Sequence, residues 1–191
     1  EYMIEHLRAT AAAASERARI ASIGCGPARE IELLLRRAPE LGRKLDVALI
    51  DQEERSIRYC ERTLGPLAAR TETRIEFIRE PVRRLLVDRS LSRTLGERVL
   101  IYSAGLFDYL NDSAFAALLA ALYEALVPGG QLVVGNMAPH NPSRLAMEYF
   151  VEWFLIHRTP DELKALASTL VPAPSAVDVE AESLGVNLFL T

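Results

Sequence analysis

Cysteine is scarce, and the two cysteines, Cys25 and Cys60, stand far apart in a chain of 191 residues. The three histidines are scattered, and no C-x-x-C or other metal-ligand spacing occurs. The sequence therefore predicts no disulfide framework and no metal site. A chain of this length can bury a sizeable hydrophobic core without such crosslinks. Unpaired cysteines fit a reduced, cytoplasmic protein.

Lysine is also scarce, since 20 of the 22 basic residues are arginines. Six arginines fall between Arg79 and Arg98, but the net charge is −4. We therefore interpret them as part of a solvated helix and loop, and predict no nucleic-acid partner. No apolar run reaches the ~18 residues that a membrane-spanning helix needs, and no signal peptide is visible. The chain starts at Glu1 inside a helical pattern, which suggests a trimmed terminus or a missing upstream segment.

Short apolar runs alternate with longer amphipathic patterns along the chain. The runs predict strands near residues 18–23, 45–50, 74–78, 98–102 and 131–135, the last after a turn at 128–130. Helices are expected near 29–38, 53–64 (ended by Gly65-Pro66), 82–95, 113–126, 143–157 and 160–169, and a hairpin over 177–190. This order predicts an α/β fold: a Rossmann-like, doubly wound, mostly parallel seven-stranded sheet with a C-terminal antiparallel hairpin.

A glycine-containing loop, Gly24-Cys25-Gly26-Pro27-Ala28, follows the first predicted strand and opens a helix. Ligands in open α/β sheets bind at such positions, because the backbone can approach closely and free N–H groups attract negative charge. A dinucleotide fingerprint wants a third glycine where this chain has Arg29. The Gly-Lys-Ser/Thr of a phosphate loop is absent as well. The loop therefore suits a ligand with an amino-acid end and an adenosine.

Asp51 stands at the end of the second predicted strand. A carboxylate at this position can accept hydrogen bonds from the two hydroxyls of a ribose, as in nucleotide-binding folds of the same class. The alternative is an ordinary aspartate that caps the following helix. The glycine loop upstream favours the ribose interpretation.

Three segments in order resemble class I S-adenosylmethionine-dependent methyltransferases: residues 23–28, the strand end at Asp51, and the Leu-Val-Pro-Gly-Gly-Gln-Leu of residues 126–132. The resemblance covers residues 18–191, which would form the methyltransferase domain after an N-terminal helical segment over 1–17. It implies S-adenosyl-L-methionine as cofactor. It also implies that the methionine part lies on the glycine loop and the ribose on Asp51. Adenine would be bordered by Gln52, Glu80, Pro81 and Val82, and the sulfonium would lie above Ser103 and Ala104.

A narrower resemblance rests on residues 102–110, Asn141-Pro142, 147–149 and 185–190. These segments resemble a bacterial group linked to making 3-hydroxypalmitic acid methyl ester, a quorum-sensing signal. The resemblance implies carboxyl O-methylation of a hydroxy fatty acid. Some members of that group carry an upstream cyclic-nucleotide-binding domain, so an upstream regulatory domain is expected as a partner of this one.

The acceptor side of the site is expected beyond the fourth and fifth strands. An ionised carboxylate is already deprotonated at neutral pH, so its methylation needs positioning and a dry site rather than a general base. An amine or phenol acceptor would benefit from a base. The polar and aromatic candidates on this side are Tyr109, Asn136, His140, Asn141, Tyr149 and Trp153. The apolar pattern at 147–156 either lines an acyl tunnel or packs as core.

Two further functions stay open at this point. A non-catalytic cofactor-binding or regulatory domain of a signalling protein would carry the same cofactor residues. An aminopropyltransferase shares the fold, but it favours extra acidic residues around a polyamine, and residues 104–108 supply only Asp108. Arg29 disfavours an NAD oxidoreductase.

Overall fold

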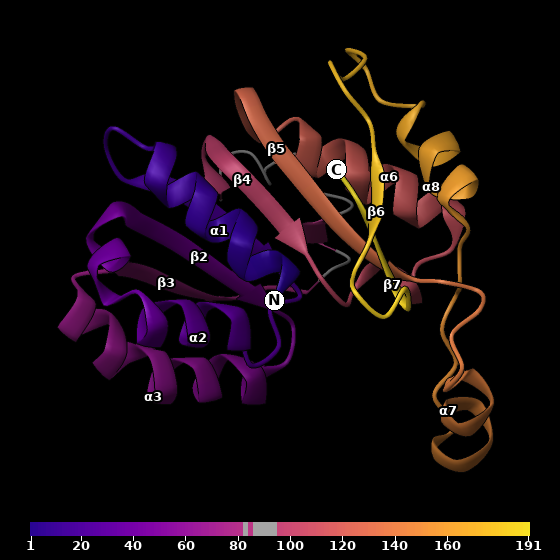
Figure 1. Ribbon diagram of the computed structural model, residues 1–191, viewed down its shortest axis with the longest axis horizontal. Helices are drawn as coiled ribbons and strands as arrows, with labels where there is room; N and C mark the ends of the chain where they lie inside the picture. Colours follow the sequence, from indigo (N-terminus) through magenta and orange to yellow (C-terminus); the bar gives the residue numbers. More distant parts are fainter. Residues whose placement is uncertain (82–83, 86–94) are drawn as a thin grey trace.

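A seven-stranded sheet forms the centre of the computed structural model, which describes residues 1–81, 84–85 and 95–191. Its strand order is β3-β2-β1-β4-β5-β7-β6 (Figure 1). The first five strands are parallel, and β7 is antiparallel to both β5 and β6. The predicted doubly wound sheet with its C-terminal antiparallel hairpin is confirmed. The strands are β1 (Ala18–Ile23), β2 (Leu45–Asp51), β3 (Arg74–Arg79), β4 (Arg98–Ser103), β5 (Leu126–Met137), β6 (Val179–Ala181) and β7 (Asn187–Leu190).

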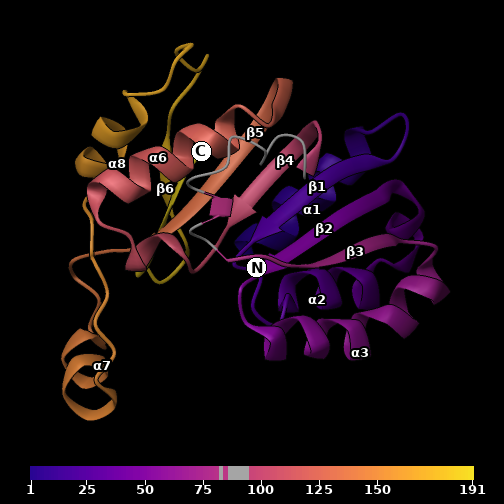
Figure 2. The same ribbon diagram turned by 180° about the vertical axis from the view of Figure 1, so that it is seen from behind.

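Helices cover both faces of the sheet. Figures 1 and 2 show α1, α2 and α3 on one face and α6 and α8 on the other, while α7 stands away from the body. Most of the helix predicted at 82–95 lies outside the described residues. Among the described residues, no helix is both long and apolar enough to cross a membrane. The helices are α1 (Tyr2–Ala13), α2 (Arg29–Arg37), α3 (Glu54–Thr71), α6 (Asp112–Tyr123), α7 (Arg144–Val151) and α8 (Pro160–Ala167), with 3-10 turns at Pro39–Lys44 and Phe107–Tyr109.

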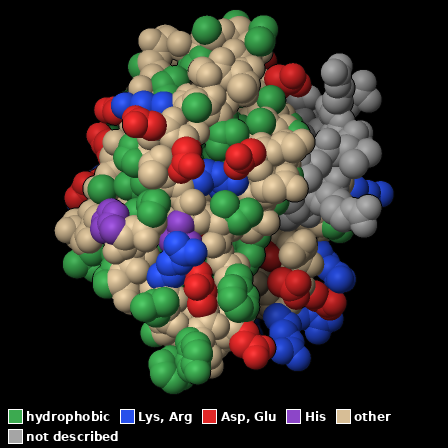
Figure 3. Space-filling view, turned by 90° about the vertical axis from the view of Figure 1, so that its right-hand side faces the viewer, with side chains coloured by type: hydrophobic (Ala, Val, Ile, Leu, Met, Phe, Trp, Pro, Cys, Tyr) green, Lys and Arg blue, Asp and Glu red, His purple; other side chains and the backbone are tan. Residues whose placement is uncertain are grey.

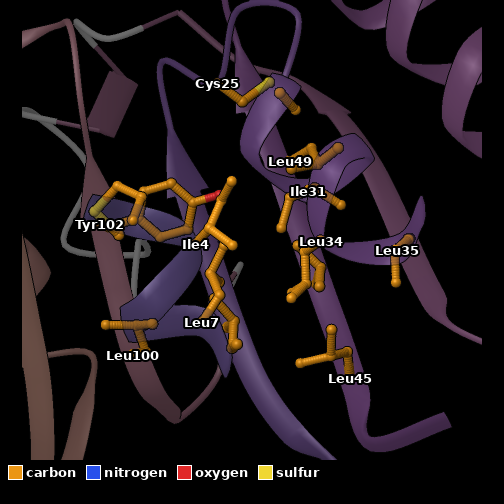
Figure 4. Packing of buried hydrophobic residues seen from close by; sticks show 14 of the residues in the cluster. Ile4, Leu7, Cys25, Ile31, Leu34, Leu35, Leu45, Leu49, Leu100 and Tyr102 are labelled. Atoms are coloured by element: carbon orange, nitrogen blue, oxygen red, sulfur yellow. The ribbon is translucent and has the colours of Figure 1, made fainter. Parts of the chain in front are cut away.

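Strand alternation divides the hydrophobic core into two layers. In β1, Ile20 faces the cluster under α1 and α2, whereas Ala21 and Ile23 face the cluster under α6 and α8. The N-terminal helix α1 buries Ile4 and Leu7 in the first cluster, against the residues of β4 and α2 labelled in Figure 4. The N-terminal helical segment therefore shares its core with the sheet.

Helix α3 corrects the predicted end at Gly65-Pro66, because it runs on to Thr71 with Pro66 inside it. A proline in a helix removes one backbone hydrogen bond and introduces a clash. Leu67, Ala68 and Thr71 of the last turns are buried. Burial of these side chains against the sheet offsets the local cost of Pro66.

The helix predicted over 143–157 is also wrong in extent, since α7 ends at Val151 and residues 152–159 have no regular secondary structure. Tertiary hydrogen bonds explain the early end. The Ile156 N–H donates to the Asp108 carbonyl at 2.7 Å, and the Arg158 N–H donates to the Met137 carbonyl at 3.1 Å. A helix continued through these residues would need both amides for its own bonds.

The Pro-Gly-Gly turn predicted before the fifth strand lies within β5 instead. Arg98 pairs with Leu126 but Leu100 pairs with Gln131, so residues 127–130 form an irregularity in the ladder. Gly129 has a φ of 78°, which favours glycine. The strand therefore begins five residues earlier than the apolar pattern suggested.

Two glycine-to-alanine changes test the packing of α3. A Cβ on Gly42 would lie 2.6 Å from the Thr71 Cβ and close to the Thr71 carbonyl, whereas a Cβ on Gly65, inside α3, would meet nothing within 4 Å. We expect Gly42→Ala to lower the free energy of unfolding by about 1–3 kcal/mol. Gly65→Ala should raise it by up to about 1 kcal/mol, since alanine is the better helix former. Urea unfolding measures both, and equal effects would contradict the packing described for Gly42.

Candidate functional site

The sheet reverses its winding direction between β1 and β4. From β1 the chain moves outward to β2 and β3 and then returns to β4 on the other side of β1. Loops leave the two neighbouring strands in opposite directions at such a point, and ligands bind in the crevice there. The loops after β1 and β4 still touch, because a Cβ on Gly24 would lie 3.0 Å from the Leu106 Cβ.

The glycine loop has left-handed backbone at three positions: φ is 63° at Gly24, 51° at Gly26 and 45° at Ala28. Glycine adopts this conformation without steric cost, and alanine does so only under strain. A Cβ on Gly26 would meet no atom within 4 Å. The loop is thus open above Gly26, and its backbone is exposed to a ligand at that point.

The carboxylate of Asp51 is bound to this loop. Its Oδ2 accepts a hydrogen bond from the Gly26 N–H and its Oδ1 accepts one from the Glu53 N–H, both at 2.8 Å. The side chain is buried. A carboxylate offers about four acceptor positions, so two stay available after these bonds. Asp51 therefore binds the backbone on either side of it and does not cap α3, whose N-cap residue is Glu53. Its remaining acceptor positions are what the predicted ribose contact would need.

The thiols of the two cysteines lie near the same backbone carbonyl of the loop. The thiols of Cys25 and Cys60 lie 3.6 Å and 3.2 Å from the Gly26 carbonyl oxygen. The hydrogen bond with Cys60, together with burial, raises the pKa of the Cys25 thiol, and the same bond lowers the pKa of Cys60. Cys25 is thus a packed residue supporting the loop, consistent with its neutral thiol form.

Two hydrogen bonds join the end of β4 to the loop region. The Ser103 hydroxyl donates to the Ile23 carbonyl at 2.7 Å, and the Tyr102 hydroxyl donates to Glu30 Oε1 at 2.6 Å. Tyr102 is fully buried, and burial raises its pKa well above the usual value. The predicted floor at Ser103 and Ala104 is therefore fixed to β1, with Ala104 exposed.

The residues predicted to border adenine lie beside Asp51. Gln52 is exposed, and the Glu80 N–H donates to the Asp51 carbonyl at 3.0 Å. Glu80 also pairs with Arg84 at 3.5 Å. Pro81 is exposed, and Val82 lies outside the described residues. The structure thus brings the glycine loop, Asp51, Gln52 and Glu80 to one edge of the sheet.

Near the end of β5, Asn136 belongs to a buried polar network around Arg158. The Arg158 guanidinium donates to Asn136 Oδ1 at 2.8 Å and to the Leu110 carbonyl at 2.6 Å, and it lies over the Phe115 ring. Its exposed partner is Asp112, at 2.8 Å. Asn136 also donates to the Ile156 carbonyl at 2.9 Å. Asn136 and Arg158 therefore attach segment 152–158 to the end of β5 and to the segment that follows β4.

The other acceptor-side candidates are spread along the rim. Asn141 is buried, and its Oδ1 accepts the Ser143 N–H at 2.9 Å. His140 is exposed, with its Nε2 beside Gly185. The Tyr109 hydroxyl accepts a hydrogen bond from the Trp153 indole N–H at 2.7 Å. Three of these four candidates, Tyr109, Asn141 and Trp153, are therefore committed to internal hydrogen bonds.

Segment 145–156 is largely apolar and largely exposed. Tyr149 is 84% exposed and Phe154 is 68% exposed. Figure 3 shows hydrophobic side chains at the lower tip of the molecule, the level of α7 in Figure 1. Among the described residues these exposed side chains belong to neither core cluster, so the interpretation as core is wrong, and the acyl tunnel stays a prediction. The exposed apolar side chains are those of Leu145, Tyr149, Phe150, Val151, Trp153, Phe154 and Ile156.

A groove of about 650 Å³ lies elsewhere, at the start of β5 and the end of β7. It is lined by side chains such as Tyr123, Leu126, Leu170 and Val177. Because β5 is parallel to β4, this end of the sheet is opposite to the glycine loop. The groove is therefore separate from the candidate site.

Comparison with solved structures shows which proteins share this fold. An O-methyltransferase family protein from Burkholderia thailandensis has a TM-score of 0.70 and 17% identity, over 99% of this chain and 54% of that one. A TehB-like SAM-dependent methyltransferase from Corynebacterium glutamicum has a TM-score of 0.59 and 19% identity, over 96% and 84%. Magnesium protoporphyrin IX methyltransferase from Synechocystis, with bound SAH, has a TM-score of 0.65 and 9% identity, over 98% and 81%.

This chain therefore has the Rossmann-like fold of S-adenosylmethionine-dependent methyltransferases. It spans 66% and 54% of the length of two of the structures it matches. No protein-family model matches the chain, and no curated protein matches it in sequence.

Sequence reasoning missed Glu30 and Arg158. Glu30 follows the glycine loop in the first turn of α2, where an acidic residue is ordinary because it complements the helix dipole. Arg158 ends an apolar segment with no local sign that it is buried. Their partners, Tyr102 and Asn136, lie 72 and 22 residues away along the chain. A local pattern gives no signal for such contacts.

Replacement of Arg158 tests the polar network. We expect Arg158→Met to lower the free energy of unfolding by about 3 kcal/mol, because Asn136 Oδ1 and the carbonyls of Phe107 and Leu110 lose the donor that Arg158 provides. Arg144→Met is the control, since Arg144 pairs with Glu148 at an exposed i,i+4 position, and it should cost less than about 1 kcal/mol. Chemical denaturation compares the two, and similar losses would exclude a dominant role for the network.

Proposed function

We propose that this chain binds S-adenosyl-L-methionine at the glycine loop and transfers its methyl group to a small-molecule or lipid-like acceptor. The observation that carries the proposal is the pairing of Asp51 with the open backbone of Gly26 at the switch point. The fold it shares with methyltransferases of known structure supports it. The residues present fit the cofactor, because the loop has room above Gly26 and Asp51 keeps acceptor positions.

The chain's own residues would bind and orient rather than react. Asp51 accepts hydrogen bonds from the ribose hydroxyls, and the loop at Gly24 and Gly26 carries the amino-acid end. Gln52 and Glu80 border the adenine. The cofactor, when bound, supplies an electrophilic methyl group on a sulfonium. Ser103 and Ala104 hold the floor toward the acceptor, and the Ser103 bond to Ile23 keeps that floor fixed.

The acceptor that best fits the rim is an apolar molecule bearing a carboxylate. Asn136 and Asn141 are committed to protein hydrogen bonds, which suits an acceptor that needs no general base. The exposed apolar side chains of segment 145–156 favour a lipid-like partner over a polar one. The finer proposal is carboxyl O-methylation of a hydroxy fatty acid, with 3-hydroxypalmitate as the test substrate.

Replacing Asp51 tests cofactor binding. We expect Asp51→Ala to weaken binding of S-adenosylhomocysteine at least ~10-fold, because two charge-assisted hydrogen bonds are lost. Glu53→Ala is the matched control, since it removes an equal charge two residues away and the Glu53 side chain is exposed. The affinity of this variant for S-adenosylhomocysteine should stay within about 2-fold of the unaltered chain. Isothermal titration calorimetry measures both variants. Unchanged affinity in Asp51→Ala would remove Asp51 from the site.

Product formation tests catalysis and the acceptor. With methyl-labelled S-adenosylmethionine and 3-hydroxypalmitate, we expect labelled methyl ester, detected by mass spectrometry, and an equal amount of S-adenosylhomocysteine. Putrescine with decarboxylated cofactor is the control for aminopropyl transfer, and it should give no product. Cofactor binding without turnover of any carboxylic acid would instead support a non-catalytic cofactor-binding domain. The exposed, unpacked α7 makes that second candidate worth testing.

A further inference from the structure

Glu30 places a second carboxylate at the glycine loop. It lies in the first turn of α2, two residues after Ala28, and its Oε1 accepts the Tyr102 hydroxyl at 2.6 Å. Tyr102 comes from β4 and Glu30 from the segment after β1, so the bond spans the switch point of the sheet. The carboxylate therefore lies close to the glycine loop, and its hydrogen bond to a fully buried tyrosine restricts its orientation.

In the described structure, Glu30 forms no salt bridge with a Lys, Arg or His side chain. Among the described residues, no Lys, Arg or His lies within 4.0 Å of its carboxylate, although Glu32, two residues on, pairs with Arg36 at 2.9 Å. Burial raises the pKa of Glu30, and the Tyr102 hydrogen bond lowers it. A carboxylate in this environment gains more from an added cation than a solvated one, because the local dielectric is low.

Asp51 does not compete with Glu30 for that cation. Both Asp51 oxygens already accept backbone N–H groups, and the proposed function assigns their remaining acceptor positions to the ribose. The amino-acid end of the proposed cofactor carries one carboxylate and one ammonium group. The carboxylate suits the free N–H groups at the start of α2. The ammonium requires an anionic acceptor near the same point.

We propose that Glu30, oriented by Tyr102, binds the ammonium group of the cofactor's amino-acid end. The inference rests on the proposed function and adds a specificity-determining residue to it. Glu30 selects ligands that carry the amino-acid group over nucleosides that lack it. Tyr102 is a positioning residue, because it acts through Glu30.

Two probes that differ in the amino-acid end test the assignment. S-adenosylhomocysteine carries that end, and 5′-methylthioadenosine keeps the adenosine and the sulfur but lacks it. We expect Glu30→Gln to weaken S-adenosylhomocysteine binding roughly 10-fold or more, as for a lost charge-assisted hydrogen bond. Binding of 5′-methylthioadenosine should stay within about 2-fold, and it also reports that the variant is folded. Calorimetry gives both constants.

Tyr102→Phe and Glu32→Gln complete the set. Tyr102→Phe should weaken binding of S-adenosylhomocysteine more than binding of 5′-methylthioadenosine. The loss should be smaller than in Glu30→Gln, because the variant frees the Glu30 side chain without removing its charge. Glu32→Gln removes an equal charge on the same helix and should leave the ratio of the two affinities unchanged.

Each remaining outcome overturns the inference in a distinct way. Equal losses for both probes in Glu30→Gln would mean that the pair only supports the loop. Unchanged S-adenosylhomocysteine affinity would mean that Glu30 does not contact the ammonium. If the unaltered chain binds neither probe, the proposed function itself fails, which separates that failure from failure of the Glu30 assignment.

Discussion

The Asp51 carboxylate binds the backbone of Gly26 and of Glu53, and the arrangement of the site depends on this contact. It fixes the glycine loop against the end of β2, while the Cys25 N–H donates to the Ile50 carbonyl on the same strand at 3.0 Å. The loop can then keep its left-handed conformations, which have no regular ladder to support them. Since Ser103 joins β4 to β1 in the same region, three strand ends are held at one point before any ligand arrives.

Much of this centre could be predicted from local sequence. Paired glycines after an apolar run, and an aspartate at the end of the next run, are short-range signals, and they mark the loop and Asp51 correctly as neighbours. Alternation of strand and helix patterns likewise specified the sheet. The predictions that were wrong concern the ends of two helices, which contacts with distant residues determine. Pro66 stays inside α3 because its helix is buried, and the helix through 157 ends at Val151 because Asp108 and Met137 take its amides.

The acceptor side follows a different principle from the cofactor side. Polar residues such as Asn136 and Asn141 look like substrate contacts in the sequence, but their hydrogen bonds hold the chain together. Arg158 is the centre of this scaffold and anchors segment 152–158. The apolar α7 is thus attached at a fixed base, while none of its side chains is buried. An acceptor would therefore contact exposed apolar side chains more than free polar groups.

The two carboxylates of the site differ because their surroundings differ. Asp51 receives two backbone N–H groups, which compensate its charge, so further ligands there are best neutral donors such as hydroxyls. Glu30 receives a single phenol hydroxyl, is partly buried, and forms no salt bridge with a described side chain. A neutral donor would leave that charge uncompensated, whereas an ammonium would offset it. If Asp51 binds the ribose and Glu30 the ammonium group, as proposed, the two carboxylates together set the direction in which the cofactor lies.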